Sequence, residues 1–198
     1  LLDAGEKVVV ADSLVTGFDW SVAPEAQLAI GDIGDPLFLD RILGDSSIEA
    51  IIHFAGSVVV PESVTNPLKY YDNNTAKSRT LMAKAVEHGV GKVILSSTAA
   101  VYGSVGEEPV VETALTIPES PYGWSKLMVE RMLADTAAAH DFRYTALRYF
   151  NVAGADPKGR TGQSTKGATH LIKVACETAA GKRPSMEVFG TDYPTRDG

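Results

Sequence analysis

The feature that most constrains the fold is a repeated alternation between short apolar runs and longer stretches with helical spacing. The apolar runs are typical of buried parallel strands and lie at 7–12, 26–30, 48–55, 93–97, 144–150 and 185–189. The helical stretches lie at 36–43, 68–88, 121–140 and 169–180. Because strands that alternate with helices form parallel sheets, we predict an α/β fold with a doubly wound parallel sheet covered on both faces.

The length of the chain limits how many domains it can form. Its 198 residues, 44% of them hydrophobic, are enough for one sizeable core and part of a second domain. The looser composition of residues 155–167 indicates a loop or a domain boundary. We therefore expect a first domain over 1–150 and the beginning of a smaller domain over 151–198.

Charge and cysteine content argue against several classes of partner and site. The net charge is −7, and no basic block is present that would attract nucleic acid or an anionic membrane surface. No apolar run approaches the length of a membrane span. Cys176 is the one cysteine, so no internal disulfide can form, which fits a reducing cytoplasm. We expect no bound metal ion.

The first residues resemble the end of a helix. The chain lacks an initiator Met, and residues 1–5 are too short and too acidic for a signal peptide. Gly5 is placed like the glycine that caps a helix C-terminus. We therefore expect the chain to begin inside a fold.

Asp12 and Asp32 each follow a predicted strand, and ligands of open parallel sheets bind beyond the carboxyl ends of the strands. A carboxylate at Asp12 can accept hydrogen bonds from both hydroxyls of an adenosine ribose and would repel a 2′-phosphate, which favours NAD over NADP. The glycine-rich phosphate turn that should precede Asp12 is absent, and residues 31–35 do not replace it. We interpret Asp32 and Ile33 as an adenine contact. The alternatives are a turn or cap residue at Asp12 and a simple turn at Asp32.

Phe54, Ala55 and Gly56 follow the third predicted strand. Small residues at such a position let the backbone approach a dinucleotide closely. The alternative is an ordinary turn between a strand and a loop.

Tyr122 and Lys126 are spaced so that they lie one turn apart on the same face of a helix. An ammonium group near a phenol stabilises the phenolate and lowers the pKa of the tyrosine, which can then act as a general base. We expect this effect here. The alternative is a chance pair on an amphipathic helix.

Three further segments supply polar groups near that helix. A hydroxyl in the run Ser96-Ser97-Thr98 could bond the same substrate oxygen as Tyr122. Asn74 lies early on the intervening helix, where it could instead be a buried residue that ties helix to strand. Asn151 ends the run Arg148-Tyr149-Phe150-Asn151 and could donate to a phosphate oxygen or simply form a turn.

In combination, these motifs resemble the UDP-glucose 4-epimerases of the extended short-chain dehydrogenase/reductase family. The resemblance covers essentially the whole chain. It rests on the order of Phe54-Ala55-Gly56, Asn73-Asn74, Ser96-Ser97-Thr98, Val101-Tyr102-Gly103, Tyr122-x-x-x-Lys126, Arg148-Tyr149-Phe150-Asn151 and Phe189-Gly190-x-Asp192-Tyr193-Pro194-Thr195-x-Asp197-Gly198.

The resemblance implies a Rossmann-like NAD-binding domain over 1–150 and the start of a UDP-sugar-binding region over 151–198. It also implies 4-epimerisation of UDP-galactose or UDP-glucose, in galactose metabolism, through a transient 4-keto sugar. Tyr122 would exchange the proton of the sugar 4-hydroxyl, Lys126 would hold the nicotinamide ribose, and Thr98 would assist. The implied cofactor-binding residues are Asp12, Asp32, Ile33, Phe54, Ala55, Gly56, Asn74, Ser96 and Tyr149, and the implied substrate-binding residues are Asn151, His170, Leu171 and Phe189. A homodimer would pair through the helices at 68–88 and 121–140.

The chain departs from the family pattern at several points. The first strand with its glycine-rich turn and the region after Gly198 are missing, so we expect a segment of a longer enzyme that binds NAD poorly by itself. Val58 stands where the family has a lysine near the cofactor, and Thr98 replaces a serine but keeps a hydroxyl.

Three alternatives remain open. A nucleotide-sugar 4,6-dehydratase of the same fold needs an acid and a base after the catalytic threonine, and Ala99 and Ala100 occupy those positions. A 4-epimerase for another nucleotide sugar would share every motif. A non-catalytic NAD-binding module would not need Tyr122, Lys126 and Thr98 together.

Overall fold

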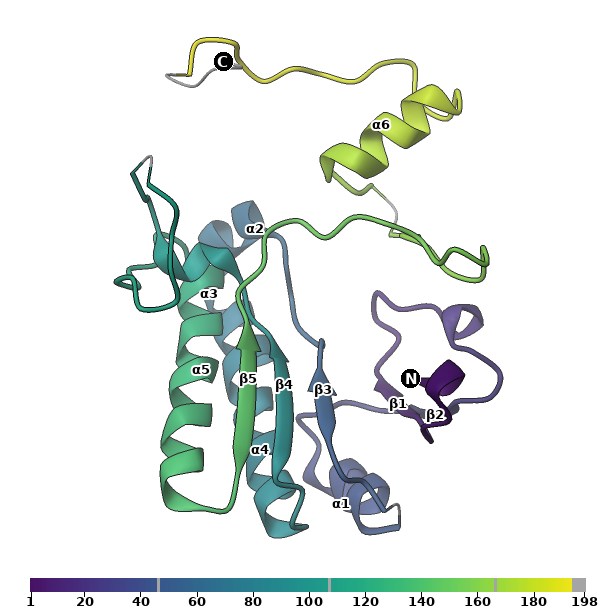
Figure 1. Ribbon diagram of the computed structural model, residues 1–198, viewed down its shortest axis with the longest axis vertical. Helices are drawn as coiled ribbons and strands as arrows, with labels where there is room; N and C mark the ends of the chain where they lie inside the picture. The colour runs from purple at the N-terminus through teal and green to yellow at the C-terminus, as the bar shows by residue number, and fades with distance from the viewer. Residues whose placement is uncertain (46, 107, 166, 194–198) are drawn as a thin grey trace. The chain divides into compact units, whose positions relative to one another are not determined.

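The computed structural model describes residues 1–45, 47–106, 108–165 and 167–193. The chain divides into two units, Leu1–Phe150 and Asn151–Gly198, and each is described by itself. Figure 1 shows the strands and helices with the labels used below.

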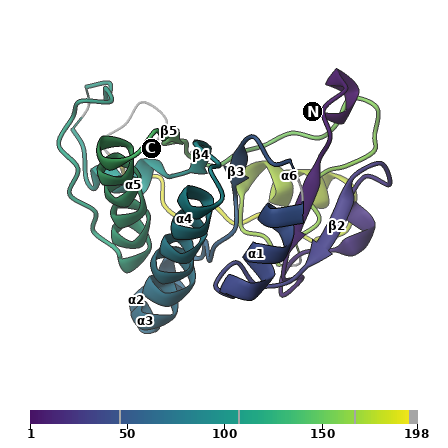
Figure 2. The same cartoon turned by 90° about the horizontal axis from the view of Figure 1, so that it is seen from below.

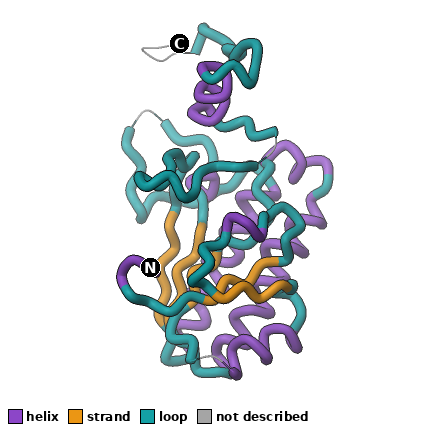
Figure 3. The backbone as a smooth tube through the Cα atoms, turned by 90° about the vertical axis from the view of Figure 1, so that its right-hand side faces the viewer, coloured by secondary structure: helices purple, strands orange, loops and turns teal. Residues whose placement is uncertain are grey.

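Parallel strands form the centre of the first unit. β1 (Val9–Asp12) pairs with β2 (Gln27–Ile30), while β3 (Ile51–His53), β4 (Lys92–Ser96) and β5 (Arg143–Leu147) pair side by side in that order. Figure 3 shows these strands in orange. A doubly wound sheet has one more strand position, between β1 and β3, and no strand of the described residues fills it. The predicted parallel Rossmann-like fold is confirmed, but its strands form two sheets.

Three helices cover one face of these sheets. They are α1 (Pro36–Asp45), α4 (Lys77–Glu87) and α5 (Pro121–Ala139), which lie in a row in Figure 2. Their apolar faces pack against β4 and its flanks in one core: Phe38, Leu39, Leu43, Leu81, Met82, Ala85, Val90, Val93, Leu95, Val129, Leu133 and Phe142. This core fixes the carboxyl end of β4 relative to the start of α5, where the predicted catalytic residues lie.

The opposite face of the three-stranded sheet is less well covered than the sequence predicted. Ile52, Ile94 and Leu147 share this face because successive strand residues alternate between faces. They remain 38%, 39% and 41% exposed. The sequence predicted a sheet covered on both faces. Within the described residues of the first unit, helices cover one face.

The helical stretch predicted at 68–88 contains an irregularity that its sequence does not reveal. It consists of α3 (Pro67–Tyr70), a π-helical segment η3 (Tyr71–Ala76) and α4. A further helix, α2 (Val60–Thr65), precedes it and was not predicted. Segments of π-helix inside α-helices often occur at functional sites, and this one contains Asn74.

Short 3₁₀ helices complete the first unit: η1 (Leu2–Ala4), η2 (Asp19–Ser21) and η4 (Ala99–Tyr102). Gly5 caps η1 in the left-handed conformation, with φ 85°, and donates its N–H to the carbonyl of Leu2. The predicted helix end at Gly5 is confirmed as a 3₁₀ turn.

The second unit contains α6 (Leu171–Ala179), which confirms the helix predicted at 169–180, and an isolated bridge between Ala155 and Gly162. The strand predicted at 185–189 is wrong. An apolar run becomes a strand only where another strand pairs with it, and the described residues of this unit offer none. The predicted substrate-domain segment from Phe189 continues through Pro194, Thr195, Asp197 and Gly198, which lie outside the described residues. Among the described residues, no helix is long and apolar enough to cross a membrane.

Candidate active site

The start of α5 brings Tyr122 close to the turn that follows β4. Ser120 caps this helix by accepting a hydrogen bond from the backbone N–H of Gly123 at 3.2 Å, and Pro121 occupies its first turn. Gly123 lies so close to η4 that an added Cβ would come within 2.9 Å of the carbonyl oxygen of Ala100. A glycine at this position therefore allows the helix to approach the segment that carries Thr98.

The hydroxyl of Thr98 lies near that of Tyr122 and lowers the pKa of the phenol. Thr98 is the N-cap of η4, where its hydroxyl accepts the N–H of Ala100 at 3.1 Å. The structure thus brings the two predicted side chains together, and their action on one substrate oxygen stays a prediction.

The predicted fall in the pKa of Tyr122 is wrong for the protein alone. Burial raises the pKa of Tyr122 above its usual value, the Thr98 hydrogen bond lowers it in part, and nearby Tyr149 raises it further. The ammonium of Lys126 is hydrogen-bonded to the carbonyl oxygen of Ser96 at 3.1 Å. Desolvation of the phenol therefore sets the direction of the Tyr122 pKa, and not Lys126 as the spacing suggested.

Lys126 is itself almost completely buried, with 3% of its surface exposed. Burial lowers the pKa of Lys126 to about 8. The side chain can therefore gain or lose its proton close to neutral pH, which is unusual for a lysine and typical of functional sites.

Asn74 ties the π-helical segment to two other parts of the unit. Its amide nitrogen donates to the carbonyl oxygen of Ser57 and to the hydroxyl of Ser125, each at 3.0 Å. Its amide oxygen accepts the N–H of Ser57 at 2.7 Å. These bonds correspond to the alternative interpretation of Asn74 as a buried tie between helix and strand.

Gly56 lies against this tie. An added Cβ would come within 2.9 Å of the side-chain oxygen of Asn74 and 3.4 Å of Nζ of Lys126, and the backbone has φ 153°. Only glycine fits this position without displacing them. Its neighbours Phe54 and Ala55 are exposed, Phe54 at 65%, so a surface is open where the sequence predicted a close approach of a dinucleotide.

Asp12 and Asp32 both lie at the carboxyl ends of strands, and their carboxylates have different partners. Asp12 accepts the N–H of Leu14 at 2.7 Å through Oδ1. Asp32 accepts the N–H of Gly34 at 2.7 Å and forms an ion pair with Lys77 at 2.5 Å. Burial acts to raise the pKa of Asp32, but these partners more than offset it and hold the pKa below its usual value. Asp32 thus already has partners in the protein, as in the alternative of a simple turn.

Ile33, Ser96 and Tyr149 occupy defined positions in the first unit. Ile33 packs against the main core. The hydroxyl of Tyr149 donates to that of Ser96 at 2.5 Å, and the carbonyl of Tyr149 accepts the N–H of Ala99 at 3.1 Å. These two bonds join the segment after β5 to the last residue of β4 and to the first residue of η4, on either side of Thr98.

The four predicted substrate residues lie in the second unit. His170 is the N-cap residue of α6, and its Nδ1 is 2.9 Å from Nε2 of Gln163. Leu171 begins α6 and is 66% exposed, and Phe189 is 83% exposed. Asn151 is also exposed. The Gln163 contact gives His170 a packing role in its own unit.

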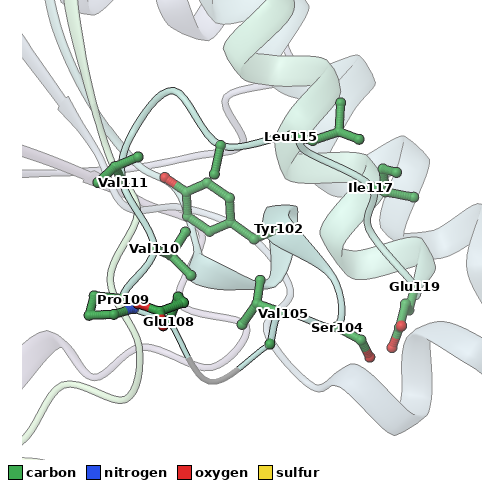
Figure 4. Close-up of a pocket in the computed structure, with 12 residues that line it drawn as sticks. Tyr102, Ser104, Val105, Glu108, Pro109, Val110, Val111, Leu115, Ile117 and Glu119 are labelled. Carbon is green, nitrogen blue, oxygen red and sulfur yellow. The ribbon is translucent and has the colours of Figure 1, made fainter.

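Sequence reasoning missed two features next to Thr98 and Tyr122. One is a buried ion pair between Glu130 and Arg148. The other is a cavity of about 440 Å³ under residues 102–119. Figure 4 shows the ring of Tyr102 in this cavity, with Val110 and Val111 around it. The spacing of Glu130, one helical turn after Lys126, was the signal that could have marked the ion pair.

Several known proteins are similar to this chain in sequence and in fold over its whole length. The model of the NAD dependent epimerase/dehydratase family matches residues 1–197. The UDP-glucose 4-epimerase of Azospirillum brasilense is 54% identical over 198 residues, which are 100% of this chain and 57% of that protein. The chain thus spans somewhat more than half the length of this relative.

Two solved structures are also similar. The UDP-glucose 4-epimerase of Brucella ovis in complex with NAD has a TM-score of 0.94 at 41% identity, over 100% of this chain and 60% of that one. The enzyme of Bifidobacterium longum in complex with NAD+ and UDP has a TM-score of 0.91 at 34% identity, over 99% of this chain and 62% of that one.

Proposed function

Because this chain belongs to the NAD dependent epimerase/dehydratase family, we propose that the whole protein is a UDP-hexose 4-epimerase that interconverts UDP-galactose and UDP-glucose. The observation that carries this proposal is the hydroxyl of Thr98 beside that of Tyr122, with Lys126 buried one helical turn further along α5. A site with a phenol, a hydroxyl and a lysine of lowered pKa is suited to moving a proton at one alcohol oxygen.

The described residues fit NAD at several positions. Asp12 would bind the adenosine ribose. Gly56 would let the backbone approach the cofactor closely, because any side chain there would collide with Asn74 and Lys126. Asp32, Ile33, Phe54, Ala55, Asn74, Ser96 and Tyr149 complete the proposed cofactor-binding set. When bound, NAD supplies an acceptor for the hydride of the sugar C4 and later returns it.

Tyr122 is the proposed proton-transfer residue. In the first half of the reaction the oxygen of Tyr122 would take the proton of the sugar 4-hydroxyl. After the 4-keto sugar has turned over in the site, Tyr122 would return the proton to the 4-keto oxygen, while the hydride returns to the opposite face of C4. Thr98 holds the phenol in place and can bond the same sugar oxygen. Because burial keeps Tyr122 protonated in the protein alone, its activation belongs to the state with ligands bound.

Lys126 is the proposed source of that activation. With a pKa of about 8, Lys126 is still mostly protonated at pH 7, so its ammonium can stabilise the phenolate of Tyr122. Its position beside Ser96 is also suited to holding the nicotinamide ribose. Ala99 and Ala100 follow Thr98 at the positions where a dehydratase would need an acid and a base, and neither alanine can transfer a proton. This supports epimerisation over dehydration.

We further propose that Asn151, His170, Leu171 and Phe189 bind the UDP-sugar. The neighbouring structure that contains UDP supports a nucleotide-sugar substrate. A second copy of the protein is the proposed partner, through the face formed by η3, α4 and α5. A cytoplasmic location agrees with the single free thiol of Cys176.

Product analysis tests this proposal directly. The whole protein is incubated with UDP-galactose, and the nucleotide sugars are separated and identified by ¹H NMR. We expect UDP-glucose, with hydrogen retained at C4. A 4-keto-6-deoxy product would instead identify a dehydratase, and an unchanged substrate in the presence of NAD would indicate a non-catalytic binding module.

A further inference from the structure

A buried carboxylate lies next to the proposed proton-transfer residues and takes no part in the reaction proposed above. Glu130 is on α5, one helical turn after Lys126, and only 7% of its surface is exposed. The hydroxyl of Ser97 donates a short hydrogen bond to its Oε1. Since a carboxylate is rarely buried without a partner, its neighbours are informative.

Arg148 is the main partner of Glu130. Its Nε lies 3.1 Å and 3.0 Å from the two carboxylate oxygens, and its Nη2 lies 2.6 Å from Oε2. The hydrogen bond to Glu130 raises the pKa of Arg148, so this guanidinium remains charged at every relevant pH. Such a planar, bidentate pair fixes both the distance and the orientation of the two side chains.

Arg148 also reaches the segment after Thr98. Its Nη1 donates to the hydroxyl of Tyr102 at 2.9 Å and to the backbone carbonyl of Glu112 at 3.1 Å, and its guanidinium carbon is 5.0 Å from the centre of the Tyr102 ring. Tyr102 is the last residue of η4 and borders the cavity in Figure 4. The guanidinium therefore joins β5, α5, η4 and the loop that follows η4.

These segments are the same ones that carry the proposed reactive groups. Ser97 directly precedes Thr98, and Thr98 caps the helix that Tyr102 ends. Arg148 directly precedes Tyr149, while Glu130 shares α5 with Tyr122 and Lys126. Thr98 is the N-cap of η4, and Tyr122 lies at the start of α5. Arg148 connects the same two elements, because it binds Glu130 on α5 and the hydroxyl of Tyr102 at the end of η4.

We propose that Glu130 and Arg148 are positioning residues, which hold η4 against α5 so that the hydroxyl of Thr98 stays beside that of Tyr122. This inference rests on the function proposed above. Buried ion pairs are weak contributors to stability, because desolvation offsets most of their attraction. A pair with so many directional bonds between two catalytic elements is better explained by geometry than by stability.

The test compares substitutions in the whole protein. Glu130→Gln breaks the charge pair, and the double variant Glu130→Met/Arg148→Met replaces it by apolar side chains of similar length. Arg131→Gln is the matched control, because it breaks an exposed pair with Asp135 at 3.1 Å on the same helix. Turnover of UDP-galactose, KM and thermal unfolding are measured for each variant.

A positioning role predicts a change in turnover that does not follow stability. We expect kcat to fall between tenfold and a hundredfold in both Glu130 variants, since small misplacements of reacting groups have effects of that order. KM should change less than about threefold, within the spread of ordinary side-chain effects. The double variant should unfold near the wild-type temperature, and the control should match wild type throughout.

A second readout does not depend on turnover. The ionisation of Tyr122 is followed by ultraviolet absorbance, as the difference between each variant and the same variant with Tyr122→Phe. If the hydroxyl of Thr98 moves away from that of Tyr122, the ionisation of Tyr122 should move to higher pH. We expect this shift in both Glu130 variants and no shift in Arg131→Gln.

The outcomes separate this inference from the proposed function. A double variant with wild-type kcat and an unshifted Tyr122 ionisation would overturn the positioning role. A wild-type protein without epimerase activity would overturn the proposed function instead, and the shift of the Tyr122 ionisation would still decide whether the pair positions the phenol.

Discussion

The hydroxyl of Thr98 acts on the ionisation of Tyr122. Burial raises the pKa of the phenol, and the neighbouring Thr98 hydroxyl lowers it in part. Removal of the hydroxyl therefore raises the pKa of Tyr122 further. The acidic limb of the pH profile of kcat should then move to higher pH, because a larger fraction of Tyr122 stays protonated.

The variant Thr98→Val tests this effect with little change in side-chain shape. We expect kcat at neutral pH to fall about tenfold, the equivalent of about 1.4 kcal/mol for one hydrogen bond. Thr98→Ser keeps the hydroxyl and should retain most of the activity. A valine variant with an unchanged pH profile would show that Thr98 does not act on the proton of Tyr122.

His53 makes the stability of the first unit dependent on pH. It is 4% exposed, and burial together with the charge of Lys126 lowers the pKa of His53 to about 4. Ser78 gives its hydroxyl hydrogen to the carbonyl of Asn74, so Nε2 of His53 must donate to Ser78 over their 2.7 Å contact. The buried imidazole is therefore neutral.

The unfolded chain binds a proton at His53 near pH 6.5, whereas the folded chain resists protonation down to about pH 4. Stability should consequently be full above pH 6.5 and fall as the pH drops toward 4. Between pH 7 and pH 5 we expect a loss of about 2 kcal/mol in the free energy of unfolding from this group. Urea unfolding of wild type and His53→Gln at the two pH values measures this contribution. It is the loss of unfolding free energy in wild type minus the loss in the variant. Equal losses in both proteins would contradict this assignment.

At the scale of elements, Gly123 allows α5 to dock against η4. A Cβ at this position would lie 2.8 Å from Cβ of Pro118 and 2.9 Å from the carbonyl oxygen of Ala100. Gly123→Ala should therefore push the start of α5 away from Thr98. We expect lower thermal stability by about 1–3 kcal/mol, the usual cost of overpacking, together with lower kcat.

Gly44→Ala is the matched control for this prediction. Gly44 is also helical, in α1, and its added Cβ would meet only ordinary contacts from 3.5 Å outward. Alanine is the better helix former, so this variant should be more stable by about 0.5–1 kcal/mol. If Gly123→Ala were equally stabilising, close docking of α5 on η4 would not be required.

The regular elements could be predicted because their patterns are local. Apolar runs marked β1 to β5, and the helical stretch at 121–140 predicted α5 to within one residue of its end. The π-helical turn within residues 71–76 and the absence of a strand at 185–189 could not be predicted. Both depend on neighbours that are distant in the sequence.

The candidate site was likewise predictable only where its pattern is local in the sequence. The spacing of Tyr122 and Lys126 marks the helix face that carries them, because helical geometry is local. The direction of the Tyr122 pKa could not be inferred, since burial depends on the whole fold. The Glu130–Arg148 pair joins residues 18 positions apart on different elements. The spacing of Glu130 after Lys126 marks Glu130 on the helix, but nothing in that spacing identifies Arg148 as its partner.

At the scale of the whole molecule, the face of η3, α4 and α5 offers a surface for a second copy. A cavity of about 560 Å³ lies on it between Tyr71, Arg79, Met128 and Met132, and Met128 is 42% exposed. Apolar side chains around a hollow are typical of protein interfaces. We expect the whole protein to be a homodimer that associates through this face.

A charge in the centre of this surface should weaken the association. Met128→Glu would place a carboxylate in the apolar contact, while Lys158→Gln makes the same change of one negative unit in net charge in the second unit. Light scattering coupled to size-exclusion chromatography should give a dimer for wild type and the Lys158 variant, and monomer for Met128→Glu at micromolar concentration. A dimer in all three proteins would locate the interface elsewhere.

The most direct test of the proposed function is the activity of Tyr122→Phe in the whole protein. This variant removes one oxygen and keeps the ring that packs edge-on against Tyr70, with ring centres 6.4 Å apart. Interconversion of UDP-galactose and UDP-glucose is measured with NAD present. We predict that kcat falls on the order of a hundredfold to ten-thousandfold, as for loss of a general acid–base group, with the fold intact. Turnover at the wild-type rate would contradict the account.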